Sequence, residues 1–309
     1  MQQILAFASL IILVIIFSIA SSNFLQFSNV MGILVSTAVI GILALGATFV
    51  IITGGIDLSV GTVMTLCSVM TGVYITVWEL PTVIGVLLGI LTGAFCGMLC
   101  GIVIAKLKIP PFIATLAMMM IAKGLALVIS GTKPIYFTAS PEFSKIALGS
   151  ILPGSNIPNA VFIFFGIAII AALILSKTII GRYNFALGSN EEATRLSGVN
   201  VDRWKIIIYM LAGVFTGIAG VLIASRLNSA QPALGSGYEL EAIAAVVIGG
   251  TSLSGGKGTI VGTVIGALIM SVLTNGLRIL SVPQEWQTVV VGFVIILAVY
   301  TDILRRRKQ

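Results

Sequence analysis

Few residues in this chain have the types and spacing that chemistry requires. The Gly-Gly-Lys-Gly run at 255–258 is similar to a phosphate-binding loop, G-x-x-x-x-G-K-[ST]. However, Thr251 stands in place of its first glycine, and Gly258 in place of its Ser or Thr. Three cysteines occur, at 67, 96 and 100, but the chain has no histidine to complete a zinc site with them. We therefore predict no catalytic residue, no metal site and no bound cofactor.

Ionisable side chains avoid the interior of the long apolar runs. All ten acidic residues lie at the ends of these runs or between them. Because pumps and proton-coupled carriers need ionisable groups deep in the membrane, we expect a neutral substrate and an energy source on another subunit. Lys123 is the one formal charge inside a run. Its side chain either extends to the membrane surface or faces a transport path.

Polar side chains that can form hydrogen bonds supply the candidates for contact with a neutral, polyhydroxylated solute. They are Asp57, Ser59, Asn228, Gln231 and Asn275. Each alone also fits a turn residue or a hydrogen bond between helices. Together they favour a hydrated path over a surface that faces lipid.

The composition is that of a membrane protein, since 58% of the 309 residues are hydrophobic and 9% are charged, against roughly a quarter charged in soluble domains. Apolar runs of the length that crosses about 30 Å of hydrocarbon recur along the chain. We predict one all-α membrane domain over residues 1–309 with about ten transmembrane helices. The spans are 4–20, 33–53, 58–77, 82–105, 109–130, 160–176, 206–224, 242–251, 259–279 and 288–304.

The span at 242–251 is too short to cross the membrane as a regular helix. Together with the glycine-rich stretch that follows it, residues 242–258 either span the membrane or re-enter it beside a polar cavity. The sequence IITGGIDLSVGT at 51–62 is similar to VVIGGTSLSGGKGTIVGT at 246–263. In both, an apolar run leads through Gly-Gly and a polar turn into a new apolar run.

Basic residues set the expected orientation, because Lys and Arg gather in the cytoplasmic loops of membrane proteins. If both termini are cytoplasmic, twelve of the seventeen basic residues lie on the inside and four on the outside, and Lys123 lies within a span. The loop 131–159 is then extracytoplasmic and the loop 177–205 cytoplasmic. The basic residues lie in such loops and in the tail rather than in a patch interleaved with aromatic residues, so we expect no nucleic-acid partner.

The cytoplasmic loop contains the signals of a short helix outside the membrane. Ser189 and Glu192 have the spacing of a capping box, and Gly198 stands where a left-handed C-terminal cap belongs. We predict a helix over about residues 190–197.

The chain resembles ribose-type ABC sugar permeases over nearly its whole length, and four segments carry the resemblance. They are TGGIDLSVG (53–61), PFIATLAMM (111–119), GRYNFALGSNEEATRLSGVNV (181–201) and SRLNSAQPALGSGYELEAIAAVVIGGTSLSGGKGTIVGT (225–263). The resemblance implies a multi-pass protein of the bacterial inner membrane that pairs with a second permease copy. It also implies a cytoplasmic ATPase that binds ATP and Mg²⁺, and an extracytoplasmic binding protein that delivers the sugar.

Importers of this type dock on the ATPase through a helix with the pattern E-A-A-x-x-x-G. The pattern is similar to Glu192, Ala193, Thr194 and Gly198 here, with Thr in place of the second Ala. The resemblance thus implies that Ser189, as the expected cap, and these four residues couple transport to ATP hydrolysis.

Ribose is the expected substrate. The same family also imports allose, xylose, galactose, inositol or a furanosyl autoinducer, because the binding protein sets most of the selectivity. A channel or a membrane-embedded enzyme would likewise have many spans. An enzyme, however, would need a titratable cluster that is missing, and a channel would not need an ATPase-docking helix.

Single cysteines at positions 145 and 195 test the orientation in a chain without its native cysteines. We expect an impermeant thiol reagent to label position 145 only from outside and position 195 only from inside. Labelling of both positions from the same side would contradict the arrangement of about ten spans.

Overall fold

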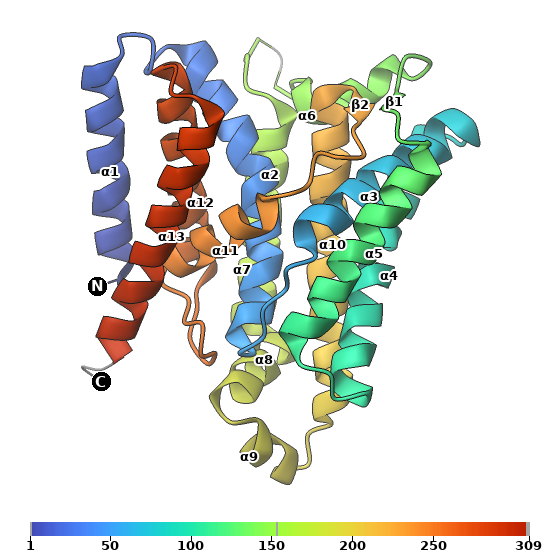
Figure 1. Cartoon of the computed structure of the whole chain (residues 1–309), viewed down its shortest axis with the longest axis vertical. Coiled ribbons are helices and arrows are strands. Elements are labelled where there is room, and N and C mark those ends of the chain that lie inside the picture. Colours follow the sequence, from blue (N-terminus) through green and yellow to red (C-terminus); the bar gives the residue numbers. More distant parts are fainter. Residues whose placement is uncertain (1, 153, 307–309) are drawn as a thin grey trace.

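Figure 1 shows the computed structural model of the chain, a bundle of helices in which residues 2–152 and 154–306 are described. The α-helices are α1 Gln2–Ala20, α2 Phe27–Ile52, α3 Val60–Gly72, α4 Thr82–Lys106, α5 Pro111–Ser130, α6 Lys145–Leu148, α7 Asn159–Lys177, α8 Ile179–Ser189, α9 Glu191–Leu196, α10 Val201–Leu227, α11 Tyr238–Ile248, α12 Ile260–Ile279 and α13 Gln284–Arg306. Val73–Val77 (η1) forms a π-helix and Pro141–Ser144 (η2) a 3₁₀-helix, while Ile135–Tyr136 (β1) and Ser229–Ala230 (β2) are two short strands.

The expectation of a nearly all-helical membrane protein is confirmed. Among the described residues, eight helices are long and apolar enough to cross a membrane. The other two predicted spans fall on α11, which has 11 residues, and on α13, whose apolar part covers Gln284–Tyr300. Each predicted span therefore corresponds to a helix, but α11 is too short to cross the membrane by itself.

α2 lies at the centre of the bundle. In the most apolar 18-residue stretch of α2, 94% of the residues are buried, whereas 11% are buried in the corresponding stretch of α1 at the edge. A helix that is apolar all round must be covered on all sides, and α10, α12, α11 and α7 pack around α2.

α4 and α10 pack backbone against backbone. Side chains added at Gly93 and Gly97 of α4 would overlap the carbonyl oxygens of Gly213 and Tyr209 on α10. Small residues at such interfaces let membrane helices approach closely, so dispersion contacts accumulate along both helices. The two helices therefore behave as one packed pair.

The two ends of the bundle differ in structure (Figure 1). At the upper end, the loop 131–159 is fastened to the end of α10. Its strand β1 pairs antiparallel with β2, and the Ser225 hydroxyl donates to the carbonyl of Phe143 at 2.6 Å. At the lower end lie α8 and α9, and α1 and α13 point their terminal ends toward the same side.

Three non-helical segments interrupt the helices, at residues 53–59, 228–237 and 249–259. In Figure 1, α3 begins and α11 lies near the middle of the bundle rather than at either end. The two similar segments identified in the sequence contact each other, because the Gly256 N–H donates a hydrogen bond of 2.8 Å to the Ile52 carbonyl. Non-helical backbone at such depth must be buried in protein or line a hydrated cavity.

We predict that Gly97→Ala lowers the free energy of unfolding by about 1–3 kcal/mol, because the added methyl overpacks the α4–α10 interface. The matched control is Gly124→Ala on α5, where an added Cβ meets nothing within 4 Å. Alanine should raise helix stability there by up to about 1 kcal/mol. The thermal unfolding midpoint of each variant in detergent measures the difference. Equal midpoints would show that α4 and α10 do not pack through this face.

Candidate functional site

The segment between α7 and α10 forms two short helices at the lower end of the bundle (Figure 1). α8 ends at Ser189, and the extended backbone of Asn190, with φ −159° and ψ 103°, separates it from α9. Asn190 Oδ1 accepts a hydrogen bond of 2.9 Å from the backbone N–H of Ala193 and thereby caps α9. Gly198 has φ +83° and turns the chain toward α10.

The predicted capping box of Ser189 and Glu192 is therefore wrong by one residue. Ser189 belongs to the last turn of α8 and so lacks the non-helical backbone of an N-cap. Asn is as favourable as Ser at this position, and Asn190 takes the role. The helix covers 191–196 rather than 190–197. The predicted left-handed backbone of Gly198 is confirmed.

α9 is joined to α10 by charged side chains. Glu191 forms ion pairs with Arg195, at 3.2 Å, and with the half-buried Lys205 on α10. The side chain of Asn200 caps α10 by accepting from the N–H of Arg203 at 3.0 Å. The ion pair of Glu191 with Lys205 thus connects α9 to α10 across the turn at Gly198.

The outer face of α9 is open. Glu192 and Ala193 are exposed, and Leu196 is 83% exposed, which is unusual for a large apolar side chain at the end of a bundle. Thr194 instead points inward and donates its hydroxyl to the Asn190 carbonyl at 2.7 Å. Thr194, which replaces the second alanine of the E-A-A-x-x-x-G pattern, therefore adds a hydrogen bond at the start of α9 and leaves its outer face unchanged.

The end of α8 touches two other segments through backbone atoms. A Cβ added at Gly188 would overlap the carbonyl oxygen of Ile52 and would lie 2.6 Å from the backbone nitrogen of Gly256. The Gly256 N–H donates a hydrogen bond of 2.8 Å to that same oxygen. Gly188, Ile52 and Gly256 form a three-way contact, here named the glycine junction, between α8, the end of α2 and the turn 249–259.

The five predicted path residues do not form one site. Asp57 accepts from the backbone N–H and the hydroxyl of Ser59, at 2.8 and 2.6 Å, just before α3 begins. Gln231 donates to the Ser229 hydroxyl at 3.0 Å, and Asn228 ends α10 with φ 49°.

Asn275 lies on α12, away from these residues, and forms reciprocal hydrogen bonds of 3.1 and 3.2 Å with Asn29 on α2. These two bonds join the two helices through their amide side chains.

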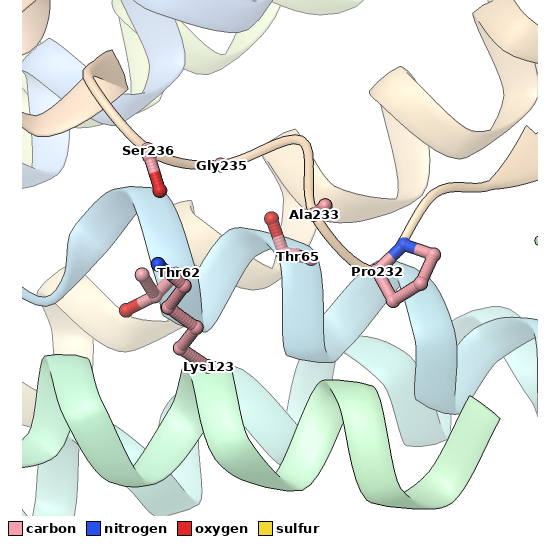
Figure 2. A pocket seen from close by; sticks show the side chains of 7 residues that line it. All are labelled: Thr62, Thr65, Lys123, Pro232, Ala233, Gly235 and Ser236. Carbon is pink, nitrogen blue, oxygen red and sulfur yellow. The ribbon is translucent and has the colours of Figure 1, made fainter. Parts of the chain in front are cut away.

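A small pocket lies where the segment 231–237 crosses α3 and α5 (Figure 2). It is lined by Thr62, Thr65, Lys123, Pro232, Ala233, Gly235 and Ser236. The sequence alone shows that Lys123 is a charge within an apolar run. It does not show which residues surround Lys123, because they come from distant parts of the chain.

One known protein family matches most of the sequence of this chain. The family described as branched-chain amino acid transport system / permease component matches residues 29–299, which include α8, α9 and all three non-helical segments. The chain belongs to this permease family. It is thus a multi-pass membrane protein, as its apolar helices also indicate.

Several sugar permeases are similar to this permease over nearly their whole length. The ribose import permease protein RbsC of Bacillus subtilis is 46% identical, with 98% of this chain and 93% of RbsC covered. RbsC of Escherichia coli K12 is 44% identical, with 95% and 91% covered. The L-arabinose transport system permease protein AraH of Escherichia coli K12 is 42% identical, with 93% and 86% covered. No solved structure matches the permease.

We predict that Asn190→Ala destabilises α9 by about 1 kcal/mol, since one N–H at the start of the helix loses its partner. Ser189→Ala is the matched control: it removes a hydroxyl that makes no hydrogen bond to a described residue. Amide hydrogen exchange of residues 191–197 measures the difference, and only Asn190→Ala should raise it. Faster exchange in Ser189→Ala alone would restore the capping box.

Proposed function

We propose that this chain is the membrane-spanning permease subunit of an ATP-driven ABC importer, and that it translocates a neutral monosaccharide, ribose in the first place. The observation that carries the proposal is the 44–46% identity to ribose import permeases over nearly the full length. The lack of acidic residues within the apolar runs supports a neutral substrate and an external source of energy.

In this proposal the chain crosses the membrane ten times with both termini in the cytoplasm. The short helices α3 and α11 complete their crossings through the non-helical segments that precede them. The positions of α1, α13, α8 and α9 toward one end of the bundle support the arrangement (Figure 1). The excess of basic residues assigned to that end supports its cytoplasmic orientation.

We propose α9 as the docking helix for a cytoplasmic ATPase, which binds the ATP and Mg²⁺ that this chain does not bind. The exposed Leu196 supports this role, because a partner that covers it would remove its apolar surface from water. The bond between Glu191 and Lys205 gives α9 a connection to α10. The glycine junction gives it a second connection, through α8, to α2 and the turn 249–259.

The opposite end is proposed to receive the sugar-binding protein. The loop 131–159 is suited to this because it is fastened to α10 by the β1–β2 pair and by Phe137 and Phe143, which stack at 4.0 Å and are fully buried. A surface held in this way can meet a partner without first being ordered. A second permease copy is proposed to complete the path.

A second candidate is a permease for another pentose. The xylose transport system permease protein XylH of Haemophilus influenzae is 32% identical over 100% of this chain, and AraH is 42% identical. Competition between D-ribose, D-xylose and L-arabinose in one uptake assay distinguishes these substrates.

The test is sugar uptake by proteoliposomes that contain the permease, the ATPase and the binding protein. We expect D-ribose uptake only when all three proteins and ATP are present. Gly198→Val should abolish this uptake while the permease still inserts. A non-glycine residue at φ +83° costs about 1–2 kcal/mol, and valine adds bulk on the docking face.

The matched control is Gly166→Val on α7, outside the proposed docking segments for the ATPase and the binding protein. An added Cβ at Gly166 likewise meets nothing within 4 Å. It should keep wild-type uptake. Uptake without ATP would indicate a channel. Wild-type uptake by Gly198→Val would remove α9 as the coupling element.

A further inference from the structure

Lys123 carries a charge within α5, about two turns before the helix ends at Ser130. No ion pair or hydrogen bond joins its side chain to the part of the chain that the structure describes. Charged groups at such depth nearly always face a protein interior or a water-filled cavity. Figure 2 shows the side chain crossing from α5 to α3, where its amine lies beside Thr62.

The segment 231–237 forms the roof of this pocket. It can pass directly over α3 because side chains are absent at the crossing point: a Cβ on Gly235 would overlap the Gly61 carbonyl and the Thr65 hydroxyl. Ala233 and Ser236 are exposed in the single chain. Since lipid cannot satisfy non-helical backbone, this face must meet water or a path closed by a second copy.

The pocket presents both donors and acceptors of hydrogen bonds. The hydroxyls of Thr62 and Thr65 donate to carbonyls of the chain just before them, at 3.1 and 3.2 Å, so their lone pairs are left to accept. The Lys123 ammonium has three donors, and the Ser236 hydroxyl both donates and accepts. A sugar hydroxyl has the same dual character and can use both kinds of partner.

The charge around the pocket favours a neutral ligand over an anion such as a lipid phosphate. A carboxylate oxygen of Glu239 lies so close to Gly61 that an added Cβ there would overlap it. The same carboxylate accepts from the Gly237 N–H at 3.1 Å, which holds it in place. The Glu239 carboxylate is thus held beside Gly61, next to Thr62 of the pocket. In addition, the outer end of α5 is about 10 Å away along the helix, and the exposed Lys123 side chain points toward α3 instead.

We infer that Lys123, Thr62 and Ser236 form a subsite that binds hydroxyl groups of the passing monosaccharide. The face made by α3, α5 and residues 231–237 is then a wall of the sugar path. This inference rests on the proposed function and adds the place where the chain contacts its substrate.

Thiol accessibility tests the wall without measuring transport. Lys123→Cys should react with a charged, membrane-impermeant methanethiosulfonate in proteoliposomes of the whole complex, and saturating D-ribose with the binding protein and ATP should slow the reaction. Ile121→Cys is the control at the same depth. It is 53% exposed but lines the apolar groove on the other side of α5, and it should react only with a lipid-soluble maleimide. The native cysteines are buried and can remain. A thiol at position 123 that only the lipid-soluble reagent reaches would overturn the inference.

Uptake of D-ribose tests the subsite itself. Lys123→Met should lower the uptake rate at least tenfold while the ATPase still co-purifies and basal ATP hydrolysis is kept, and Thr62→Val should lower uptake severalfold. The control is Thr92→Val, whose hydroxyl also bonds to its own helix but borders the apolar groove. Its uptake should stay within twofold of the wild type.

The two hypotheses fail in different ways. Wild-type uptake by Lys123→Met would overturn the subsite and leave the importer intact. If the wild-type complex itself takes up no pentose, the proposed function fails, and the reaction of the thiol at position 123 with the charged reagent still decides whether this face is hydrated.

Discussion

The fold depends on how the backbone of three non-helical segments is satisfied inside a membrane. Lipid offers no hydrogen bonds to free N–H and C=O groups, so each break in a helix needs partners from elsewhere in the protein. At the end of α2, the Ile52 carbonyl receives the N–H of Gly256 from a remote turn. The N–H of Leu58 donates to the Thr115 hydroxyl of α5 at 3.2 Å. The arrangement of α2, α5 and the turn 249–259 follows from this requirement.

The same close contacts divide the bundle into parts that move together. Backbone packing between α4 and α10 leaves no freedom for one to slide past the other without a clash. The pair of Glu191 and Lys205 attaches α9 to this body, whereas Gly188 places the end of α8 against α2. A displacement of α9 therefore reaches the centre of the bundle by two routes. The face that carries Lys123 lies on α5, whose first turn follows closely after Lys108, which pairs with Asp202 on α10 at 2.8 Å.

Much of this could be predicted from the sequence, because the length of apolar runs and the sign of loop charges act locally. The positions of the helices and the left-handed backbone of Gly198 are determined by such local signals. The sequence predicts Ser189 as the cap of α9, because Ser and Asn are both favourable caps and the residues near the cap do not determine where α8 ends. That end is set by contact of Gly188 with Ile52. Long-range pairing, such as Asn275 with Asn29, and the neighbours of Lys123 likewise depend on how distant segments meet.

The glycine junction also has a consequence for biosynthesis. Ile52 is made early and Gly256 late, so the carbonyl at the end of α2 has no protein partner while most of the chain is still being synthesised. Until then, water at the lower end of the bundle is the available partner for this carbonyl. The contact between α2, α8 and the turn 249–259 can therefore form only after α11 has been made. The order of synthesis and the final contact are linked through one backbone hydrogen bond.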